Sequence, residues 1–372
     1  MESKATSPIV ELSTKPDYLK CVDRVEAWFQ GEILDRVPIR FHRHNAEYEV
    51  MHTSQHTTLR DRWFDAEFQA DEFLRSIHGM RFNAETFPIY MPNVGPNAYA
   101  AFHGGDMTFE ETTSWYHEMI HNYDTDLSKI NFSKENVFYK KLMELTEVGL
   151  QKCGDKFLVG YPDLHPGLDC ALAWRGTNEL CMDLIMEREN AQKLFNLAGE
   201  HFLDVYDDFD RVIKAAGMPS CTWMNLPIPN GRFHIPSADF SFMISPEDYI
   251  EFGLPILKEE VKTMSHNIFH VDGKGVANHI DTILSVPEVR CIQWVQGMAD
   301  DYPIMQHLDF IRYLQSRNRG IIVDLDKEDL NEYMEKMSPL NTFLWIATEC
   351  EEEEFSIMKK VEKWSRKKLF AD

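Results

Sequence analysis

The segment Asn267-Ile268-Phe269-His270-Val271-Asp272-Gly273 decides the fold, because it is a short apolar run that ends in polar residues and a glycine. Runs of this kind are typical of parallel strands that are buried on both faces of a sheet. The chain contains eight of them. We therefore expect strands at residues 37–42, 86–91, 157–163, 220–226, 267–272, 289–295, 320–324 and 342–348.

Amphipathic helical patterns separate these strands. One helix is expected to begin at Ser245-Pro246-Glu247-Asp248, where a serine cap precedes a proline and two acids, and to run toward Met264. A second is expected over residues 190–216, because Gly217 and Pro219 form a typical helix stop. The last helix is expected to open with four glutamates at 351–354 and to close with Arg366, Lys367 and Lys368, which suits the helix dipole.

Eight strands that alternate with helices predict an α/β protein with a closed (β/α)8, or TIM, barrel. A doubly wound open sheet is the alternative, but no Gly-x-Gly-x-x-Gly follows the first strand and the sequence contains no P-loop. We expect residues 1–372 to form a single barrel domain. A helical extension is expected at 1–34, and an insertion at 92–156 is expected to act as a lid over the barrel mouth.

The composition argues against several functions. The 372 residues include 61 acidic and 38 basic side chains, for a formal net charge of −23. This charge opposes binding to nucleic acid or to an anionic membrane. No apolar run reaches the roughly 18 residues of a membrane span, and residues 1–18 lack the apolar core of a signal peptide. Seven scattered cysteines without a Cys-x-x-Cys pair are typical of a reduced, cytoplasmic protein.

Polar residues gather where the expected strands end, which is where barrel enzymes have their active sites. His270 and Asp272 are two residues apart on one strand, so both side chains face the same side. This pair suits a zinc ion with a third ligand from another strand, and Cys350 after the last strand is our candidate. His42 or His44 is an alternative, because the first and last strands meet when a barrel closes. A site without metal, in which His270 and Asp272 bond each other or the substrate, is also open.

Other residues are expected to line the same mouth. Asp239 and His270 are the candidate catalytic residues, and Asp239 would orient the substrate or act as a general base. An ordinary Asx turn at Asp239 is the alternative. Arg40 and Arg43 would clamp a carboxylate or phosphate, or form an ion pair at the rim. The remaining candidates for substrate contacts are His42, Asp163, His165, His234, Gln293 and Trp294.

Several stretches, in order along the chain, resemble the uroporphyrinogen decarboxylase superfamily. They are spread from Asp35 to the last helix. The matching pieces are Asp35-Arg36-Val37-Pro38-Ile39, Pro92-Asn93-Val94-Gly95, residues 239–247, Phe269-His270-Val271-Asp272-Gly273 and Ile292-Gln293-Trp294-Val295-Gln296-Gly297. The resemblance implies a (β/α)8 barrel. The methyltransferase-like branches of the superfamily are more similar than the decarboxylase itself.

The decarboxylase has Arg-Gln-Ala-Gly-Arg-Tyr after its first strand, where this chain has Arg43-His44-Asn45-Ala46-Glu47-Tyr48. The second arginine is absent, so we do not expect a porphyrinogen with many carboxylates to bind. The corrinoid-dependent methyltransferases of the superfamily hold zinc with a His-x-Cys pair and a distant Cys. The matching residues here are His270, Asp272 and Cys350. An aspartate ligand makes zinc a stronger Lewis acid, which favours an ether or amine methyl donor over a thiol.

The resemblance therefore implies a zinc-dependent methyltransferase. It would move a methyl group between a small methylated substrate and a corrinoid that a partner protein carries. A metal-free decarboxylase or other lyase acting on a small carboxylated substrate is an alternative, and so is a non-catalytic protein that binds a corrinoid or another small ligand. The density of titratable residues at the strand ends favours an enzyme. The substrate and the oligomeric state stay open, a homodimer included.

Overall fold

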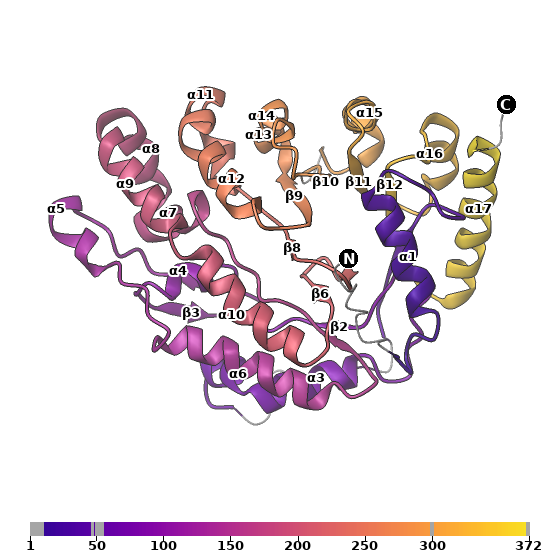
Figure 1. Ribbon diagram of the computed structural model, residues 1–372, viewed down its shortest axis with the longest axis horizontal. Coiled ribbons are helices and arrows are strands. Elements are labelled where there is room, and N and C mark those ends of the chain that lie inside the picture. Colours follow the sequence, from indigo (N-terminus) through magenta and orange to yellow (C-terminus); the bar gives the residue numbers. More distant parts are fainter. Residues whose placement is uncertain (1–10, 46–47, 49–55, 298–300, 370–372) are drawn as a thin grey trace, which may run out of the picture.

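A computed structural model describes residues 11–45, 48, 56–297 and 301–369. Its main sheet has six strands, all paired in parallel, in the order β1-β12-β11-β10-β9-β8. The strands are β1 (Ile39–Arg43), β8 (Phe233–His234), β9 (His266–Asp272), β10 (Cys291–Val295), β11 (Gly320–Asp324) and β12 (Thr342–Thr348). The first strand therefore pairs with the last, and Figure 1 shows the indigo helix α1 close to the yellow helix α17.

The strand predictions at 267–272, 289–295, 320–324, 342–348 and 37–42 are confirmed to within two residues at each end. Most residues of β9, β10, β11 and β12 are buried, in keeping with their apolar runs, whereas β1 buries only Ile39 and Phe41, on one face. The strand β8 was not predicted, because Phe233 and His234 have neither the length nor the composition of such a run.

The other expected strands are much shorter than predicted. Residues 86–91 contain only β2 (Ile89–Tyr90), and residues 157–163 contain only β5 (Leu158–Val159), which pairs with β2 in parallel. Proline has no N–H to donate to a ladder, and prolines lie within or next to each of the expected runs 86–91, 157–163 and 220–226. The prolines concerned are Pro88, Pro92, Pro162, Pro219 and Pro227.

The expected fourth strand at 220–226 is wrong as a single element. It holds β6 (Ser220–Cys221) and then a turn at Asn225, whose φ is +55° and whose N–H bonds to Thr222 O at 2.8 Å. The chain returns as β7 (Pro227–Ile228), antiparallel to β6. Asparagine tolerates this left-handed backbone better than most residues.

The prediction of a closed (β/α)8 barrel needs correction, because the regular sheet is a curled half-barrel of six strands that fits a TIM-like fold. The pairs β2–β5 and β6–β7 are linked to this sheet and to one another by single hydrogen bonds, some of them from residues beside the strands. Glu85 N donates to Ile39 O at 2.8 Å, Tyr161 N donates to Cys221 O at 2.8 Å, and Ser220 Oγ donates to Gly231 O at 2.7 Å. The described residues thus contain no continuous eight-stranded ladder.

Helices surround the strands (Figure 1). They are α1 (Tyr18–Phe29), α2 (Leu59–Phe64), α3 (Ala66–Ser76), α4 (Ala98–Ala101), α5 (Tyr123–Asp126), α6 (Val137–Lys152), α7 (Leu168–Arg175), α8 (Thr177–Met186), α9 (Arg188–Gly199), α10 (Phe202–Ala215), α11 (Pro246–Asp248), α12 (Leu254–Val261), α13 (Gly273–Ala277), α14 (Ile280–Leu284), α15 (Leu308–Ser316), α16 (Leu330–Lys336) and α17 (Glu351–Leu369). No helix in the described part of the chain is long and apolar enough to cross a membrane.

The helix signals in the sequence are partly confirmed. Ser245 caps α11 by accepting a hydrogen bond from Asp248 N, and the chain continues through a π-helical turn, η3 (Tyr249–Gly253), into α12. The last helix, α17, opens with the four glutamates as expected. The single helix expected at 190–216 is wrong, since α9 ends at Gly199 and α10 begins at Phe202.

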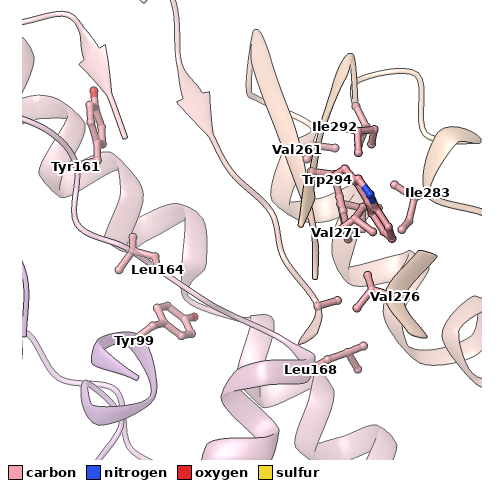
Figure 2. Close-up of a cluster of buried hydrophobic side chains, with 14 of the residues drawn as sticks. Tyr99, Tyr161, Leu164, Leu168, Val261, Val271, Val276, Ile283, Ile292 and Trp294 are labelled. Carbon is pink, nitrogen blue, oxygen red and sulfur yellow. The ribbon is translucent and has the colours of Figure 1, made fainter. Parts of the chain in front are cut away.

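Two apolar layers hold the fold together. The inner layer includes Ile268, Cys291, Ile322 and Phe343, which come from alternate positions on neighbouring strands. The outer layer lies between the sheet and the helices, and Figure 2 shows its part around Val271, Ile292 and Trp294. Alternation along a strand sends neighbouring residues into different layers, which decides which polar residues can reach the mouth.

The expected extension at 1–34 contains α1, and its residues 1–10 lie outside the described part of the chain. The expected insertion at 92–156 contains α4, a hairpin of β3 (Met107–Phe109) and β4 (Ser114–Tyr116), α5, a 3-10 turn η1 (Leu127–Lys129) and α6. The single domain and the role of this insertion as a lid stay predictions.

Candidate functional site

Three side chains with metal-binding atoms converge at the carboxyl end of β9. His270 and Asp272 belong to β9 itself, and Asp239 opens the 3-10 helix η2 (Asp239–Met243) just after β8. One ligand atom from each residue lies within 4.8 Å of the other two. Among the residues that the structure describes, no other three histidine, cysteine, aspartate or glutamate side chains have ligand atoms this close together. The sequence predicted His270 and Asp272 as a pair, and the fold adds Asp239 to it.

Gln293 orients the ring of His270. The two residues face each other in the register of β9 and β10, and Gln293 Oε1 lies 2.8 Å from His270 Nδ1. An amide oxygen accepts a hydrogen bond from Nδ1–H, which leaves the lone pair of Nε2 available to a ligand. Trp223 packs edge-on against the same ring, with 5.3 Å between the ring centroids. His270 is thus preset in the tautomer that a metal ligand needs.

The pKa of Asp239 is raised to about 6. Its carboxyl group opens to solvent on one side, but the walls of the mouth desolvate it, and the negative charges of Asp169 and Asp272 add to this effect. His270 and His165 act in the opposite direction. A bound cation would reduce the repulsion between these neighbouring carboxylates. The donor set of one imidazole and two carboxylates therefore fits zinc or a similar divalent ion.

Asp163 and His165 form an ion pair beside this group. His165 Nε2 lies 2.8 Å from Asp163 Oδ2, and His165 Nδ1 lies 2.8 Å from Ser237 Oγ. Burial opposes a charge on the ring, but Asp163, followed by Asp169 and Asp239, raises the pKa of His165 to about 10. His165 is therefore a cation at neutral pH, held beside Asp163.

Arg40 is a cation inside the mouth. Its guanidinium group lies over the ring of Trp345 at 4.3 Å, and Nη1 donates to Met224 O at 3.2 Å. In the described ranges, no carboxylate lies within 4.0 Å of it. Burial lowers its pKa to about 10, while the more distant Asp324 acts against this shift. An arginine without an acid partner is suited to hold the anionic end of a ligand.

The other candidates on β1 and just after it lie at the rim, beside a small cavity. Arg43 points to α17, where Nε donates to Glu354 Oε1 at 3.0 Å, so it forms the rim ion pair that the sequence left open. His42 within β1 and His44 just after it are both exposed. Arg40, His42 and Arg43 line a cavity of about 150 Å³ between β1 and the chain before β2, and Asn225 lies on its other side.

Cys350 does not join the three-residue group. It follows β12, and β10 and β11 separate that strand from β9 in the sheet. The thiol is half-buried and free. Asp239, and not the predicted Cys350, is the third residue whose ligand atom lies close to those of His270 and Asp272.

The structure places Trp294 and His234 away from the mouth. Trp294 is 2% exposed in the outer apolar layer, with Phe310 at 4.7 Å, and Figure 2 shows it among Ile292, Val271 and Ile283. It follows Gln293 on the strand and so faces the opposite side. His234 is buried, and its Nε2 lies 2.9 Å from Glu260 Oε1. Burial lowers the pKa of His234 to about 3 and raises that of Glu260, so this is an uncharged pair in the core.

Sequence reasoning missed Asp324 and Asp169. Asp324 ends β11, so the strand-end rule that selected Asp272 would have found it; burial and the nearby Asp326 raise its pKa. Asp169 lies in the first turn of α7 and gave no local signal. Its partners come from residues 237–240, far along the chain, so only the fold reveals its contacts.

No family model matches the sequence, and no curated protein matches it. The fold is similar to solved structures, among them a methyltransferase from Methanosarcina mazei. That likeness has a TM-score of 0.61, covers 92% of this chain and 98% of that chain, and has 10% sequence identity. At this identity it establishes a TIM-like α/β fold. The resemblance to the uroporphyrinogen decarboxylase superfamily stays a prediction.

Proposed function

We propose that the chain is a metal-dependent methyltransferase that holds one zinc ion through Asp239, His270 and Asp272. The observation that carries the proposal is the convergence of these three donors at the strand ends, together with the fixed tautomer of His270. Zinc, when bound, supplies a Lewis acid for the heteroatom that carries the methyl group. The similar fold of the Methanosarcina mazei methyltransferase supports this choice of reaction.

The residues of the chain have separate roles in this proposal. Gln293 holds the His270 ring through Nδ1, which leaves Nε2 to act as the ligand atom. Arg40 binds an anionic group of the substrate, since its only side-chain hydrogen bond in the described residues goes to a carbonyl. The turn at residues 223–224 links the two, because Trp223 contacts His270 and Met224 accepts from Arg40. A small methylated substrate with an anionic end would fit this arrangement.

The acceptor or donor on the other side of the reaction would be the corrinoid of a partner protein. The test is a methyl-transfer assay with free corrinoid and a panel of methylated ethers, amines and thiols, run beside a measurement of zinc per chain. We expect about one zinc per chain and transfer that His270→Ala abolishes. A His270→Ala protein with full zinc content and full transfer would contradict the proposal.

A second candidate is a metal-free decarboxylase or other lyase. The cations Arg40 and His165 favour it, because they would hold a substrate carboxylate in the mouth. Stoichiometric zinc in protein purified without added metal would argue against this candidate. Binding of a corrinoid without any turnover would instead support a non-catalytic binding protein.

A further inference from the structure

Asp169 is attached to the segment that carries Asp239. Its Oδ2 accepts hydrogen bonds from Ser237 Oγ at 3.1 Å and from Asp239 N at 3.0 Å, and its Oδ1 accepts one from Phe240 N at 2.9 Å. One carboxylate therefore bonds the chain on both sides of Asp239. Hydrogen bonds to a charged acceptor are among the stronger ones in proteins, so this junction is rigid.

His165 extends the junction in one direction. A doubly protonated ring donates from Nε2 to Asp163 and from Nδ1 to Ser237 Oγ, and the Ser237 hydroxyl then donates to Asp169. Each donor thus has an acceptor. The ring lies one hydroxyl group away from the Asp169 carboxylate, so the hydrogen bonds run without a break from Asp163 to the segment that carries Asp239.

The far end of η2 is held as well. Phe242 lies against Gly275 so closely that a Cβ there would come within 2.1 Å of the ring. His279 Nε2 lies 2.8 Å from Ser241 O, and it also stacks on Tyr249 with 4.6 Å between centroids. Since Gly275 and His279 follow Asp272 in the chain, η2 is tied both to α7 and to the segment after β9.

We propose that Asp169 is a positioning residue that holds Asp239 beside His270 and Asp272. The inference rests on the proposed function, in which Asp239 is a zinc ligand. Asp169 itself lies behind the segment and does not belong to the three-residue group. Residues that orient metal ligands from behind typically change metal affinity about 10–100-fold when they are replaced.

The test is Asp169→Asn, which keeps the shape but replaces one acceptor oxygen by an NH2 group. At least one of the three hydrogen bonds is then lost. We expect zinc to bind about 10–100-fold more weakly, measured by competition with a chromophoric chelator. Asp126→Asn is a matched control, because Asp126 also accepts two backbone N–H groups, from His121 and Asn122, both at 2.9 Å. Its zinc affinity should equal that of the unmodified protein, and equal affinity in Asp169→Asn would overturn the proposal.

Hydrogen exchange of the metal-free protein gives a second measurement. In Asp169→Asn the amides of Asp239 and Phe240 should exchange at least about tenfold faster, and those near Asp126 should not change. If the unmodified protein binds no zinc, the metal site fails, but unchanged exchange at these amides would still reject the role of Asp169.

If Asp169→Asn does not fold, Ser237→Ala is the second variant, because it removes one of the three hydrogen bonds to Asp169. Unaltered zinc affinity and exchange in Ser237→Ala would likewise overturn the inference.

Discussion

At the scale of single residues, the metal group depends on side chains that do not touch the metal. His270 has two ring nitrogens, and the partner of one decides what the other can do. Gln293 is 7% exposed and reaches Nδ1 from the neighbouring strand, so it settles the tautomer before any ligand arrives. Its role can be separated from simple packing by a substitution of similar volume.

We expect Gln293→Leu to weaken zinc binding about 10–100-fold, because the ring loses the acceptor that orients it. Chelator competition measures the effect. Gln296→Leu serves as the control, since Gln296 is also buried, near the same strand end, but bonds to Tyr302 O. Zinc affinity that falls equally in both variants would show a general effect of destabilisation instead.

Arg40→Gln is expected to raise KM for an anionic methylated substrate about 10–100-fold and to leave kcat largely unchanged. The reason is that a hydrogen bond to a charged group is worth about 1.5–3 kcal/mol, and Arg40 binds the substrate at a distance from the reacting atoms. Steady-state kinetics with the substrate from the transfer assay measure both constants. Arg40→Lys should recover part of the loss. A fall in kcat with KM unchanged would contradict this role.

At the scale of secondary-structure elements, the junction between β1 and β2 depends on a buried cluster of charges. Glu85 is fully buried and accepts hydrogen bonds from Arg24 Nη1 at 3.0 Å, from Arg36 Nη1 at 2.7 Å and from Ile39 N at 2.7 Å. These contacts replace the ladder that β1 and β2 do not form. A single carboxylate thus connects the helix α1, the first strand and the segment before the second.

Glu85→Gln should lower the free energy of unfolding by about 3–5 kcal/mol, because it leaves the buried guanidinium group of Arg36 without its paired acid and removes one of the two acids that pair with Arg24. Urea denaturation followed by circular dichroism measures the change. Glu135→Gln is the comparison, since its pair with Lys140 is exposed and should contribute at most about 1 kcal/mol. A small effect at Glu85 would mean that other contacts hold the junction.

The elements that the sequence predicted well are strands in which most residues are buried. The runs at 320–324 and 342–348 coincide with β11 and β12, in which only Asp324 and Ala347 are exposed. The runs around β2, β5 and β6 are equally apolar, but their prolines interrupt the ladder. The hydrophobic pattern alone does not reveal the hydrogen bonds that these prolines cannot make. For the site, His270 and Asp272 were found from their spacing on one strand, whereas Asp239 and Asp169 meet only through the fold.

At the scale of the whole molecule, acid stability should depend on Asp35, between α1 and β1. Hydrogen bonds from Arg24, at 2.5 and 2.8 Å, outweigh partial burial and lower its pKa to about 2. The unfolded chain has an ordinary pKa near 4. The stabilisation is therefore present above about pH 4 and is lost as the pH falls toward 2.

Asp35→Asn should flatten this part of the pH profile. Unfolding free energies between pH 5 and pH 3 should fall less steeply in the variant than in the unmodified protein, and the two proteins should differ least at the lowest pH. Equal slopes for both proteins would contradict the assignment.

The pairing of β1 with β12 has a consequence for synthesis of the chain. The partner of Ile39 is Leu344, so the first strand emerges from the ribosome long before its neighbour exists. Such distant pairing slows folding and leaves an open strand edge that other chains can join. Charged side chains discourage that aggregation, and β1 carries Arg40 and Arg43 among its five residues. The arginine that we assign to the substrate would thus first protect the nascent chain.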